Sequence, residues 1–308
     1  MLLSGKRLSF ALLVGLLLAA GSPPAHAWPS SGYTKTKYPI VLAHGLLGFK
    51  NLLGVVDYFF GIESGLESDG ARVFVTQVTA VQSSEARGEQ LLAQVQTILA
   101  VTGATKVNLI AHSQGAQDSR YVAGVRPDLV ASVTTVGGVN KGATLADLLQ
   151  DGNSPLIADL VNALGSLIDV LSGHPSRQDA FAAVASLSTQ GSLAFNAKFP
   201  AGVPTSACGN GAAEANGVRF WSWSGTGVST NVLDISDPIL ALTSLVYTEA
   251  NDGLVGRCSS HLGTVIKDNY FYNHLDEVNQ ALGLTSPFEA NPVAVFRSHA
   301  NRLKNAGL

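Results

Sequence analysis

A serine stands at the abrupt end of an apolar, strand-like run in this chain. Residues 106–115 read Lys-Val-Asn-Leu-Ile-Ala-His-Ser-Gln-Gly, so Ser113 has a small residue two positions before it and two positions after it. A sharp turn from a strand into a helix brings both elements so close together that only Gly or Ala fits at those flanking positions. Among the serines followed by glycine two residues later, only Ser113 also has a small residue two positions earlier. The motif predicts a strand, a tight turn that presents the Ser113 hydroxyl, and a helix.

The first residues have the pattern of a secretory signal peptide. Lys6 and Arg7 precede a short apolar stretch, which is followed by two prolines and the small-x-small triplet Ala-His-Ala. A membrane span needs roughly 20 apolar residues, so this stretch is too short to anchor the protein. We expect residues 1–27 to be removed and the mature chain, residues 28–308, to be secreted as a single domain.

Composition places the mature chain among globular proteins. Loss of the signal peptide removes two basic residues and changes the formal net charge from −3 to −5, and no basic patch invites nucleic acid. With 46% apolar and 13% charged residues, the chain can bury one large core. Cys208 and Cys258 lie in an exported protein, where a disulfide persists, and we therefore expect them to pair.

Strand and helix patterns alternate through the first half of the chain. The strand-like runs are at residues 38–43, 73–78, 106–111 and 130–136, and the helical patterns at residues 83–101 and 114–125. Gly103 follows the first helix as a C-cap would. This alternation predicts a mostly parallel sheet covered by helices on both faces. Strand-like patterns resume at residues 218–224 and 239–248, and an amphipathic helix around residues 293–303 closes the chain.

The alternation breaks after residue 136, and residues 142–200 are predicted to form a helical cap inserted in the sheet domain. Within it, residues 159–171 carry an apolar face made of Leu160, Val161, Leu164, Leu167, Ile168 and Leu171. Such a face fits a core helix. It also fits a mobile lid that covers an apolar substrate site and turns toward a lipid surface.

The Ser113 hydroxyl needs partners before it can act as a nucleophile. A serine hydroxyl is a weak nucleophile at neutral pH, so a histidine must accept its proton and a carboxylate must orient that histidine. In a sheet protein of this class the order along the chain is serine, then acid, then histidine. Four histidines follow the serine: His174, His261, His274 and His299.

His274 is the favoured base among these four. It lies in a polar break after the apolar and aromatic residues 265–272, which suits a loop after the final strand of the sheet. His261 is the alternative, although its closeness to a cysteine indicates that it lines a disulfide. His174 falls in the predicted cap and His299 on the terminal helix, where a solvated surface histidine is the ordinary expectation.

Asp252 is the favoured orienting acid. It lies in the sequence Asn-Asp-Gly-Leu-Val after an apolar run, as expected for a turn at the end of a strand. Asp276 is a poorer candidate, because it lies only two residues from His274 and side chains at that spacing do not face each other on a helix. A plain turn aspartate is the alternative interpretation of Asp252.

Backbone amides near Ser113 can meet the negative charge that develops on a substrate oxygen. Residues 43–48 read Ala-His-Gly-Leu-Leu-Gly directly after the first strand, and the two glycines let the backbone approach a substrate. We predict that the N–H of Leu46 acts there together with the N–H of Gln114, at the start of the helix after Ser113. Each such donor contributes roughly 3 to 4 kcal/mol in other acyl-transfer enzymes. A Gly-rich turn without this role is the alternative.

Several of these motifs together resemble the secreted lipases of the Pseudomonas and Burkholderia type. The similar segments are Lys-Tyr-Pro-Ile-Val-Leu-Ala-His-Gly-Leu-Leu-Gly-Phe from residue 37, the turn at Ser113, Asn-Asp-Gly-Leu-Val from residue 251, and Asn-His-Leu-Asp-Glu-Val-Asn-Gln from residue 273. The resemblance covers essentially the whole mature chain. It implies an α/β-hydrolase fold with an inserted helical lid. Ala111 and Ala116 depart from it, because glycine is usual at both positions.

The resemblance also implies roles for particular residues. By motif position it gives a catalytic triad of Ser113, Asp252 and His274. It gives Leu46 and Gln114 as the oxyanion donors, and Cys208 and Cys258 as the disulfide. It further implies one structural calcium ion, held by Asp234 and Asp276 with the backbone carbonyls of Gln280 and Leu284. Aspartate and carbonyl oxygens are the hard ligands that calcium takes, but the sequence alone would not reveal this site.

The implied activity is hydrolysis of long-chain triacylglycerols at a lipid–water interface. The resemblance implies export through the periplasm with a dedicated membrane-anchored foldase, and we expect the mature protein to be a monomer. A short-chain carboxylesterase or a polyester depolymerase is the alternative activity. A hydrolase-like fold that has lost activity and binds lipid or a partner is a further alternative, but binding alone requires no serine, aspartate and histidine in this order.

Overall fold

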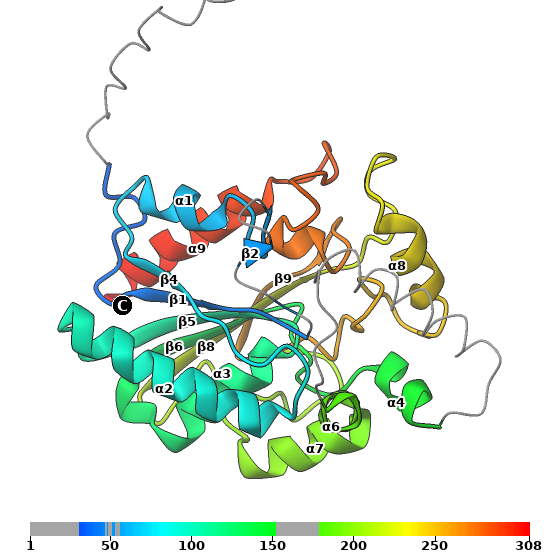
Figure 1. The fold of residues 1–308 in the computed structure, drawn as a ribbon, viewed down its shortest axis with the longest axis horizontal. Helices are drawn as coiled ribbons and strands as arrows, with labels where there is room; N and C mark the ends of the chain where they lie inside the picture. The colour runs from blue at the N-terminus through cyan, green and yellow to red at the C-terminus, as the bar shows by residue number, and fades with distance from the viewer. Residues whose placement is uncertain (1–30, 47, 49–50, 53–55, 152–178) are drawn as a thin grey trace, which may run out of the picture. The chain divides into compact units, whose positions relative to one another are not determined.

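The central sheet of the protein is almost entirely parallel (Figure 1). The computed structural model describes residues 31–46, 48, 51–52, 56–151 and 179–308. The predicted signal peptide and the predicted lid helix at residues 159–171 lie outside these residues, as does His174. Within the described residues no helix is long and apolar enough to cross a membrane.

The strand order agrees with the predicted alternation of strands and helices. Five strands follow one another across the sheet, in the order β4 (Val73–Val75), β1 (Ile40–Ala43), β5 (Val107–His112), β6 (Val130–Val136) and β8 (Val218–Gly225). The outer side of β8 pairs with two further strands, β9 (Thr264–Tyr270) in parallel and the short β7 (Glu214–Ala215) antiparallel. A separate two-stranded sheet consists of β2 (Asn51–Leu52) and β3 (Val56–Asp57).

Helices cover both faces of the sheet, so the predicted α/β architecture is confirmed (Figure 1). On one face α1 (Ile62–Glu67) contacts α9 (Pro292–Asn305), and on the other α2 (Ser84–Thr102) contacts α3 (Gly115–Val125). The side chains of β1 alternate between the two cores, because successive residues of a strand point to opposite faces. Ile40 and Leu42 pack with α1 and α9, whereas Val41 and Ala43 pack with α2 and α3. Gly103 caps α2 in the left-handed conformation, as predicted.

The remaining helices of the described residues lie in loop segments between the strands or after the last strand. Between β6 and β8 the chain forms α4 (Thr144–Asp151), α6 (Ala180–Leu187) and α7 (Thr189–Lys198), all within the predicted cap. Among the described residues, short 3-10 helices occupy Pro127–Leu129 and Asp276–Val278. Each of the strands β1, β5, β6 and β8 ends at the same edge of the sheet, because these strands are parallel. This edge therefore collects the loops that follow them.

The predicted strand at residues 239–248 is wrong, because the chain forms helix α8 (Asp237–Ser244) there. Pro238 lies in the first helical turn, where its missing N–H leaves no hydrogen bond unmade. Leu240 is buried, but Leu242 and Leu245 are 37% and 77% exposed. Because apolar residues also occupy the solvent-facing side of this helix, the sequence does not show the alternation of apolar and polar residues that is typical of a helix. Asp252 consequently follows a helix and a loop instead of a strand, next to an isolated bridge between its neighbour Asn251 and Gly256.

The expectation of a solvated His299 is also wrong. His299 is completely buried on the inner face of α9, at helical spacing from Phe296 and Leu303. Its Nε2 lies 2.8 Å from the Thr134 hydroxyl of β6, and its ring packs against Trp223. Burial, with a smaller contribution from the nearby Arg302 charge, lowers the pKa of His299 to about 3. The histidine is therefore a neutral core residue.

Candidate active site

Ser113 occupies a strained turn between β5 and α3. Its φ angle is 55°, in the left-handed region that residues other than glycine rarely adopt. Three backbone hydrogen bonds hold the turn, because the Ser113 N–H donates to Val136 at 3.1 Å and the Ser113 carbonyl accepts from Ala116 and Val139 at 3.1 and 3.3 Å. Strain of this kind persists only where the surroundings enforce it, and such places are often functional. The side chain is 9% exposed, at the edge where the parallel strands end.

The small residues around Ser113 are required by close contacts. A Cβ atom at Gly115 would lie 2.7 Å from the carbonyl oxygens of both Ala43 and His44, so the start of α3 packs directly on the end of β1. Ala116, which replaces a usual glycine, is fully buried and faces Gly138, where an added Cβ would lie 2.8 Å from the Ala116 methyl. Because residue 138 is glycine and has no side chain, there is space for the methyl group of Ala116. Ala111 is fully buried in the core beneath α2 and α3.

The structure brings His274 and Asp252 together in buried surroundings. The Nδ1–H of His274 donates to Asp252 Oδ2 at 2.8 Å, and the His274 N–H donates to the Asp252 carbonyl at 2.9 Å. The other carboxylate oxygen, Oδ1, accepts from the N–H groups of Leu254 and Val255 at 2.9 and 2.7 Å. These contacts stabilise the buried negative charge and fix the histidine tautomer. They leave His274 Nε2 as the ring nitrogen that can accept a proton.

Contacts of neighbouring residues place this pair beside Ser113. The ring of His112, immediately before the serine, lies 4.4 Å from the His274 ring between centroids. A Cβ atom on Gly45 would lie 2.6 Å from the Ser113 Cβ, so the segment after β1 touches the serine itself. The sequence-predicted serine, acid, histidine and oxyanion segment therefore lie at one edge of the sheet, contributed by four different loops.

The amide groups of Leu46 and Gln114 are available for a ligand. Among the described residues, neither N–H donates a hydrogen bond, whereas the Gly45 N–H donates to the Tyr58 hydroxyl at 3.0 Å. The Gly45 carbonyl belongs to the same peptide group as the Leu46 N–H. It accepts from His44 Nδ1–H at 2.9 Å, since Nε2 of that ring accepts from the Val78 N–H. Fixing the carbonyl orients the Leu46 N–H.

A fully buried arginine also holds the oxyanion segment. Arg87 of α2 donates from Nη2 to the carbonyls of His44 and Gly45 at 2.8 and 3.1 Å, and its Nε pairs with Asp118 of α3 at 2.9 Å. The sequence interpretation missed this residue. A signal was present, because Arg87 lies four residues before Leu91, on the buried face of the helix.

Glu277 is a second buried carboxyl group that the sequence interpretation missed. One of its oxygens, Oε1, accepts from the Gly225 N–H, and Oε2 lies 3.7 Å from His112 Nε2. Burial first, and then the charge of Asp252, raises the pKa of Glu277 well above its usual range.

The loop residues beyond β8 gather three carboxylates around Asn273. Its Nδ2 donates to Asp237 at 2.9 Å and lies 3.2 Å from Asp234, while its N–H donates to Asp276 at 3.1 Å. Asp276 Oδ2 also accepts from Thr230, but the buried Oδ1 has no partner among the described residues. Burial first, with contributions from the charges of Asp234 and Asp237, raises the pKa of Asp276 to about 7. An unpartnered carboxylate oxygen among like charges fits a cation site.

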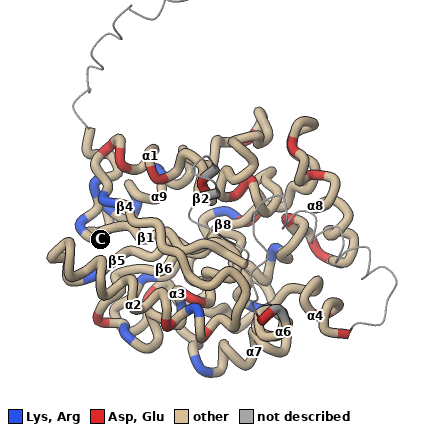
Figure 2. The backbone as a smooth tube through the Cα atoms, viewed as in Figure 1, with Lys and Arg blue, Asp and Glu red and all other residues tan. Residues whose placement is uncertain are grey.

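The predicted carbonyl ligands lie on the same loop. Gln280 is buried, and its carbonyl accepts from the Leu282 N–H at 2.8 Å, which leaves one lone pair for a cation. Leu284 is partly exposed, and its N–H donates to the Ala281 carbonyl. Asp237, at the start of α8, was not predicted, although it lies only three residues after Asp234. Acidic positions recur along this part of the chain (Figure 2).

His112, His274 and Glu277 form another group of possible ligands, whose ligand atoms lie within 4.8 Å of one another. Both ring nitrogens of His112 already face the Tyr58 hydroxyl and the His274 carbonyl. Burial is the first cause that raises the pKa of Glu277 well above its usual range, and this disfavours the charged carboxylate that a cation would need. We assign no cation to this group.

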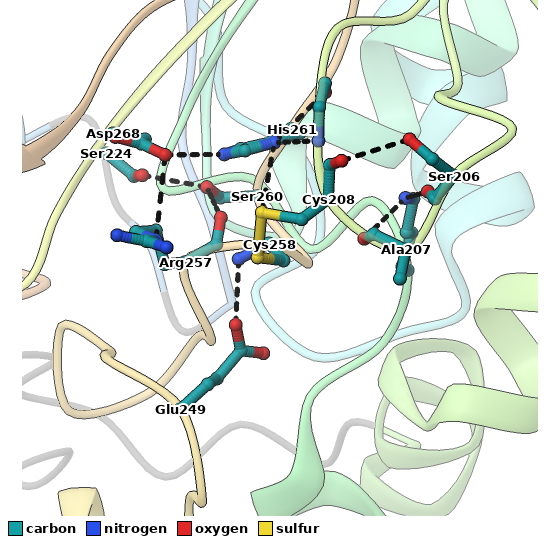
Figure 3. The surroundings of a disulfide bond; sticks show 12 residues. Ser206, Ala207, Cys208, Ser224, Glu249, Arg257, Cys258, Ser260, His261 and Asp268 are labelled. Atoms are coloured by element: carbon teal, nitrogen blue, oxygen red, sulfur yellow. Dashed lines mark hydrogen bonds and ion pairs between the residues drawn. A yellow bond between two sulfur atoms is a disulfide. The ribbon is translucent and has the colours of Figure 1, made fainter.

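The predicted disulfide between Cys208 and Cys258 is confirmed (Figure 3). His261, the alternative base, lies beside it and is 3% exposed. Its Nδ1 contacts the backbone N–H of Gly209 at 3.0 Å, and its Nε2 lies 3.1 Å from Asp268. Both ring nitrogens are therefore engaged away from Ser113.

Comparison with known proteins agrees with this geometry. A family model described as alpha/beta hydrolase fold matches residues 38–278. A triacylglycerol lipase of Vibrio cholerae serotype O1 is 56% identical over 310 residues, which cover 96% of this chain and 98% of that protein. Triacylglycerol lipases of Burkholderia plantarii and Pseudomonas fragi are 44% and 43% identical, covering 96% and 89% of this chain and 92% and 98% of those proteins.

Solved structures support the fold. The mature form of the Bacillus licheniformis lipase BlEst2 superposes with a TM-score of 0.62 at 19% identity, over 92% of this chain and 96% of that one. At this identity the similarity concerns the fold alone. The sequence relatives and the family model carry the assignment further: the chain belongs to the alpha/beta hydrolases and, within them, to the bacterial lipases, and is a carboxylic ester hydrolase.

Proposed function

We propose that the protein is a triacylglycerol lipase that hydrolyses long-chain esters through an acyl-enzyme formed on Ser113. His274 Nε2 accepts the proton of the Ser113 hydroxyl as the oxygen attacks the ester carbonyl carbon. Asp252 orients the ring and stabilises the imidazolium. The histidine then returns the proton to the departing alcohol oxygen, and a water molecule hydrolyses the acyl-enzyme by the same route. The buried His274–Asp252 pair beside a strained serine is the observation that carries this proposal.

The N–H groups of Leu46 and Gln114 donate hydrogen bonds to the substrate carbonyl oxygen and stabilise the negative charge that develops on it. Both amides lack a partner among the described residues, and that of Leu46 is held in orientation by Arg87 and His44. Fixed donors stabilise an oxyanion because they need no reorganisation during the reaction. Mutation of Arg87 would affect the reaction through this peptide group.

Partly buried apolar side chains at and near the oxyanion segment support an apolar acyl group in the substrate. Leu46, Val184 and Leu254 pack on a buried cluster that lines the same edge of the sheet, formed by Val139, Ala143, Ala146, Leu187 and Val255. The relatives named as triacylglycerol lipases point to the same substrate class. A short-chain carboxylesterase is the alternative outcome of the substrate test below, and a polyester depolymerase is a further alternative activity.

A calcium ion would fit at Asp276, whose buried Oδ1 has no partner among the described residues. Asp234 and Asp276 would hold it together with the carbonyls of Gln280 and Leu284. A divalent cation would neutralise the clustered carboxylates and fix the loop that begins at His274, so its role is structural. The residues themselves support the position of the base, since Asn273 and Asp276 hydrogen-bond each other across the turn that contains His274.

Secretion as a mature chain, folding with a dedicated foldase and opening of a lid belong to the same proposal. The signal-peptide pattern and the disulfide between Cys208 and Cys258 support export, because disulfides persist outside the cytosol.

If residues 159–171 form the lid, Leu164→Asp with Leu167→Asp impairs hydrolysis of emulsified triolein much more than hydrolysis of a soluble ester. Equal losses on both substrates would instead mark these residues as core. Full activity after unassisted refolding would exclude the foldase.

The test of the activity uses purified, correctly folded protein and two ester substrates. We expect faster hydrolysis of emulsified trioleoylglycerol than of a soluble butyrate ester; the reverse order would establish a short-chain esterase. A fluorophosphonate probe should label the wild type and leave Ser113→Ala unlabelled. Labelling that survives this substitution would reject Ser113 as the nucleophile.

A further inference from the structure

A continuous chain of hydrogen bonds joins the oxyanion segment to the loop of the candidate base. The Gly45 N–H donates to the Tyr58 hydroxyl oxygen at 3.0 Å. That hydroxyl lies 2.6 Å from His112 Nδ1, and His112 Nε2 lies 2.9 Å from the His274 carbonyl oxygen. This series of hydrogen bonds includes the neighbour of Ser113, because His112 directly precedes the serine.

The chemistry of the end groups fixes the direction of every bond in this chain. A carbonyl oxygen only accepts, so His112 Nε2 carries the proton that it donates to His274. Nδ1 of the same neutral ring then accepts from the Tyr58 hydroxyl, which in turn accepts from the Gly45 N–H. Burial, and next the electrostatic effect of the neighbouring His274, lowers the pKa of His112 well below its usual range. Burial also raises the pKa of Tyr58. Both side chains therefore keep the protonation states that the chain of bonds requires.

Both residues are buried in the protein. Tyr58 is 3% exposed and His112 is not exposed at all. The two rings contact each other at 5.7 Å between centroids, and the His112 ring lies 4.4 Å from the His274 ring. A buried network in which every member has its partners is rigid, because breaking one bond leaves a buried polar group unsatisfied.

We propose that Tyr58 and His112 are positioning residues that set the oxyanion segment and the base loop in register with Ser113. The inference rests on the proposed function, since it concerns the same site. Tyr58 anchors the Gly45 N–H, and the next amide along the chain is that of Leu46. His112 anchors the backbone carbonyl of His274. One pair of neutral side chains thus fixes both the amide that meets the oxyanion and the residue that moves the proton.

The first test is Tyr58→Phe, which removes one hydroxyl and retains the ring. We expect kcat on a soluble ester to fall about 10- to 100-fold with little change in KM, because misplacement of about 1 Å at reacting groups costs this much. The rate of Ser113 labelling by a fluorophosphonate should fall in parallel. Tyr121→Phe is the matched control, since its hydroxyl bonds Glu89 in an exposed contact between α3 and α2 and touches no residue of the hydrogen-bond series, so its loss should leave both rates unchanged.

The second test asks whether the two residues act as one unit. His112→Leu should lower kcat by a similar factor, and His112→Gln should recover much of it, because the glutamine amide offers a donor and an acceptor at the spacing of the imidazole nitrogens. In the Tyr58→Phe, His112→Leu double variant the loss should stay near that of the worse single variant. Additive losses, or an unchanged kcat in Tyr58→Phe, would overturn the inference. An inactive, unlabelled wild type would instead reject the proposed function.

Discussion

Two buried histidines of this protein each pair with an aspartate, yet the pairs differ in what they leave free. His274 uses Nδ1 for Asp252 at 2.8 Å, and His261 uses Nε2 for Asp268 at 3.1 Å. The second ring nitrogen of His261 contacts the backbone of Gly209, whereas His274 Nε2 has no hydrogen-bond partner among the described residues. Asp252 is completely buried, while the Asp268 side chain is 29% exposed. A histidine–aspartate pair therefore indicates a proton-transfer site only where the second ring nitrogen is not already bonded and the pair lies beside a nucleophile.

The two pairs are also braced by different means. The disulfide at Cys258 lies next to the His261 pair, whereas the carboxylates around Asn273 lie next to the His274 pair. The disulfide stabilises the loop of the His261 pair covalently, whereas the carboxylates near the His274 pair would need a bound cation to stabilise that loop. Treatments that remove one brace or the other should separate effects on activity from effects on stability.

The largest expected difference follows from making the same substitution in each pair. Asp252→Asn should lower kcat about 10,000-fold, because the histidine loses both its orienting charge and the correct tautomer. Asp268→Asn should change kcat by less than about twofold, as for a surface substitution away from the site. Steady-state rates of both variants on one soluble ester test this. Comparable losses would mean that the two pairs have been assigned the wrong roles.

Removal of the proposed cation should act on the His274 pair. Prolonged chelation, or Asp276→Ala, should lower activity by roughly 10- to 100-fold, the range seen when groups that support a metal ligand are removed. Elemental analysis must confirm that the metal is absent, and the melting temperature should fall as well. Unchanged activity and melting temperature in metal-free protein would reject a calcium ion at Asp234 and Asp276.

Reduction of the disulfide should act on stability and not on chemistry. Cys208 and Cys258 are separated by 50 residues, and in the chain-entropy model such a bridge contributes about 4 kcal/mol. The closed segment contains Asp252 but neither Ser113 nor His274. We expect reduced protein to unfold at lower denaturant concentration while its activity at room temperature is largely kept. Inactivation without unfolding would show that the bridge also positions the acid.

The smallest expected effect concerns a histidine outside both pairs. Burial lowers the pKa of His299 to about 3, so between pH 6.5 and 3 the unfolded chain binds a proton that the folded chain does not. The free energy of unfolding therefore falls with decreasing pH across this window, by about 1.4 kcal/mol per pH unit for one proton. Denaturation of wild type and His299→Gln at pH 7 and 4.5 measures this contribution. An equal pH dependence in both proteins would contradict a neutral buried His299.

The sequence predicted those features that depend on local patterns. The turn at Ser113 needs small neighbours two residues away, and such a requirement is legible in a short stretch of sequence. The strands at residues 106–111 and 130–136 were recognisable because strands buried on both faces read as continuous apolar runs. The helix at Asp237–Ser244 was missed because apolar side chains on its exposed side obscured its period.

Supporting residues from distant segments were not predictable in this way. Tyr58 and Arg87 reach the oxyanion segment from 13 and 42 residues away, and only the register of the folded sheet brings them there. Glu277 next to Asp252 and Asp237 next to Asn273 likewise meet through loop packing. A single sequence carries no local pattern for contacts of this range. The local motifs predicted the oxyanion donors and the resemblance implied the calcium ligands, whereas the residues that hold these segments are visible only in the structure.

The two open edges of the sheet bear on how the protein behaves at high concentration. At one edge β4 is only three residues long, and at the other no strand among the described residues pairs with the outer side of β9. Strand β9 carries Lys267 and Asp268 in its centre, and Lys267 pairs with Glu289 of the following loop. Short and charged edge strands disfavour edge-to-edge addition of a second chain. The sheet that organises the active site thus offers little template for aggregation.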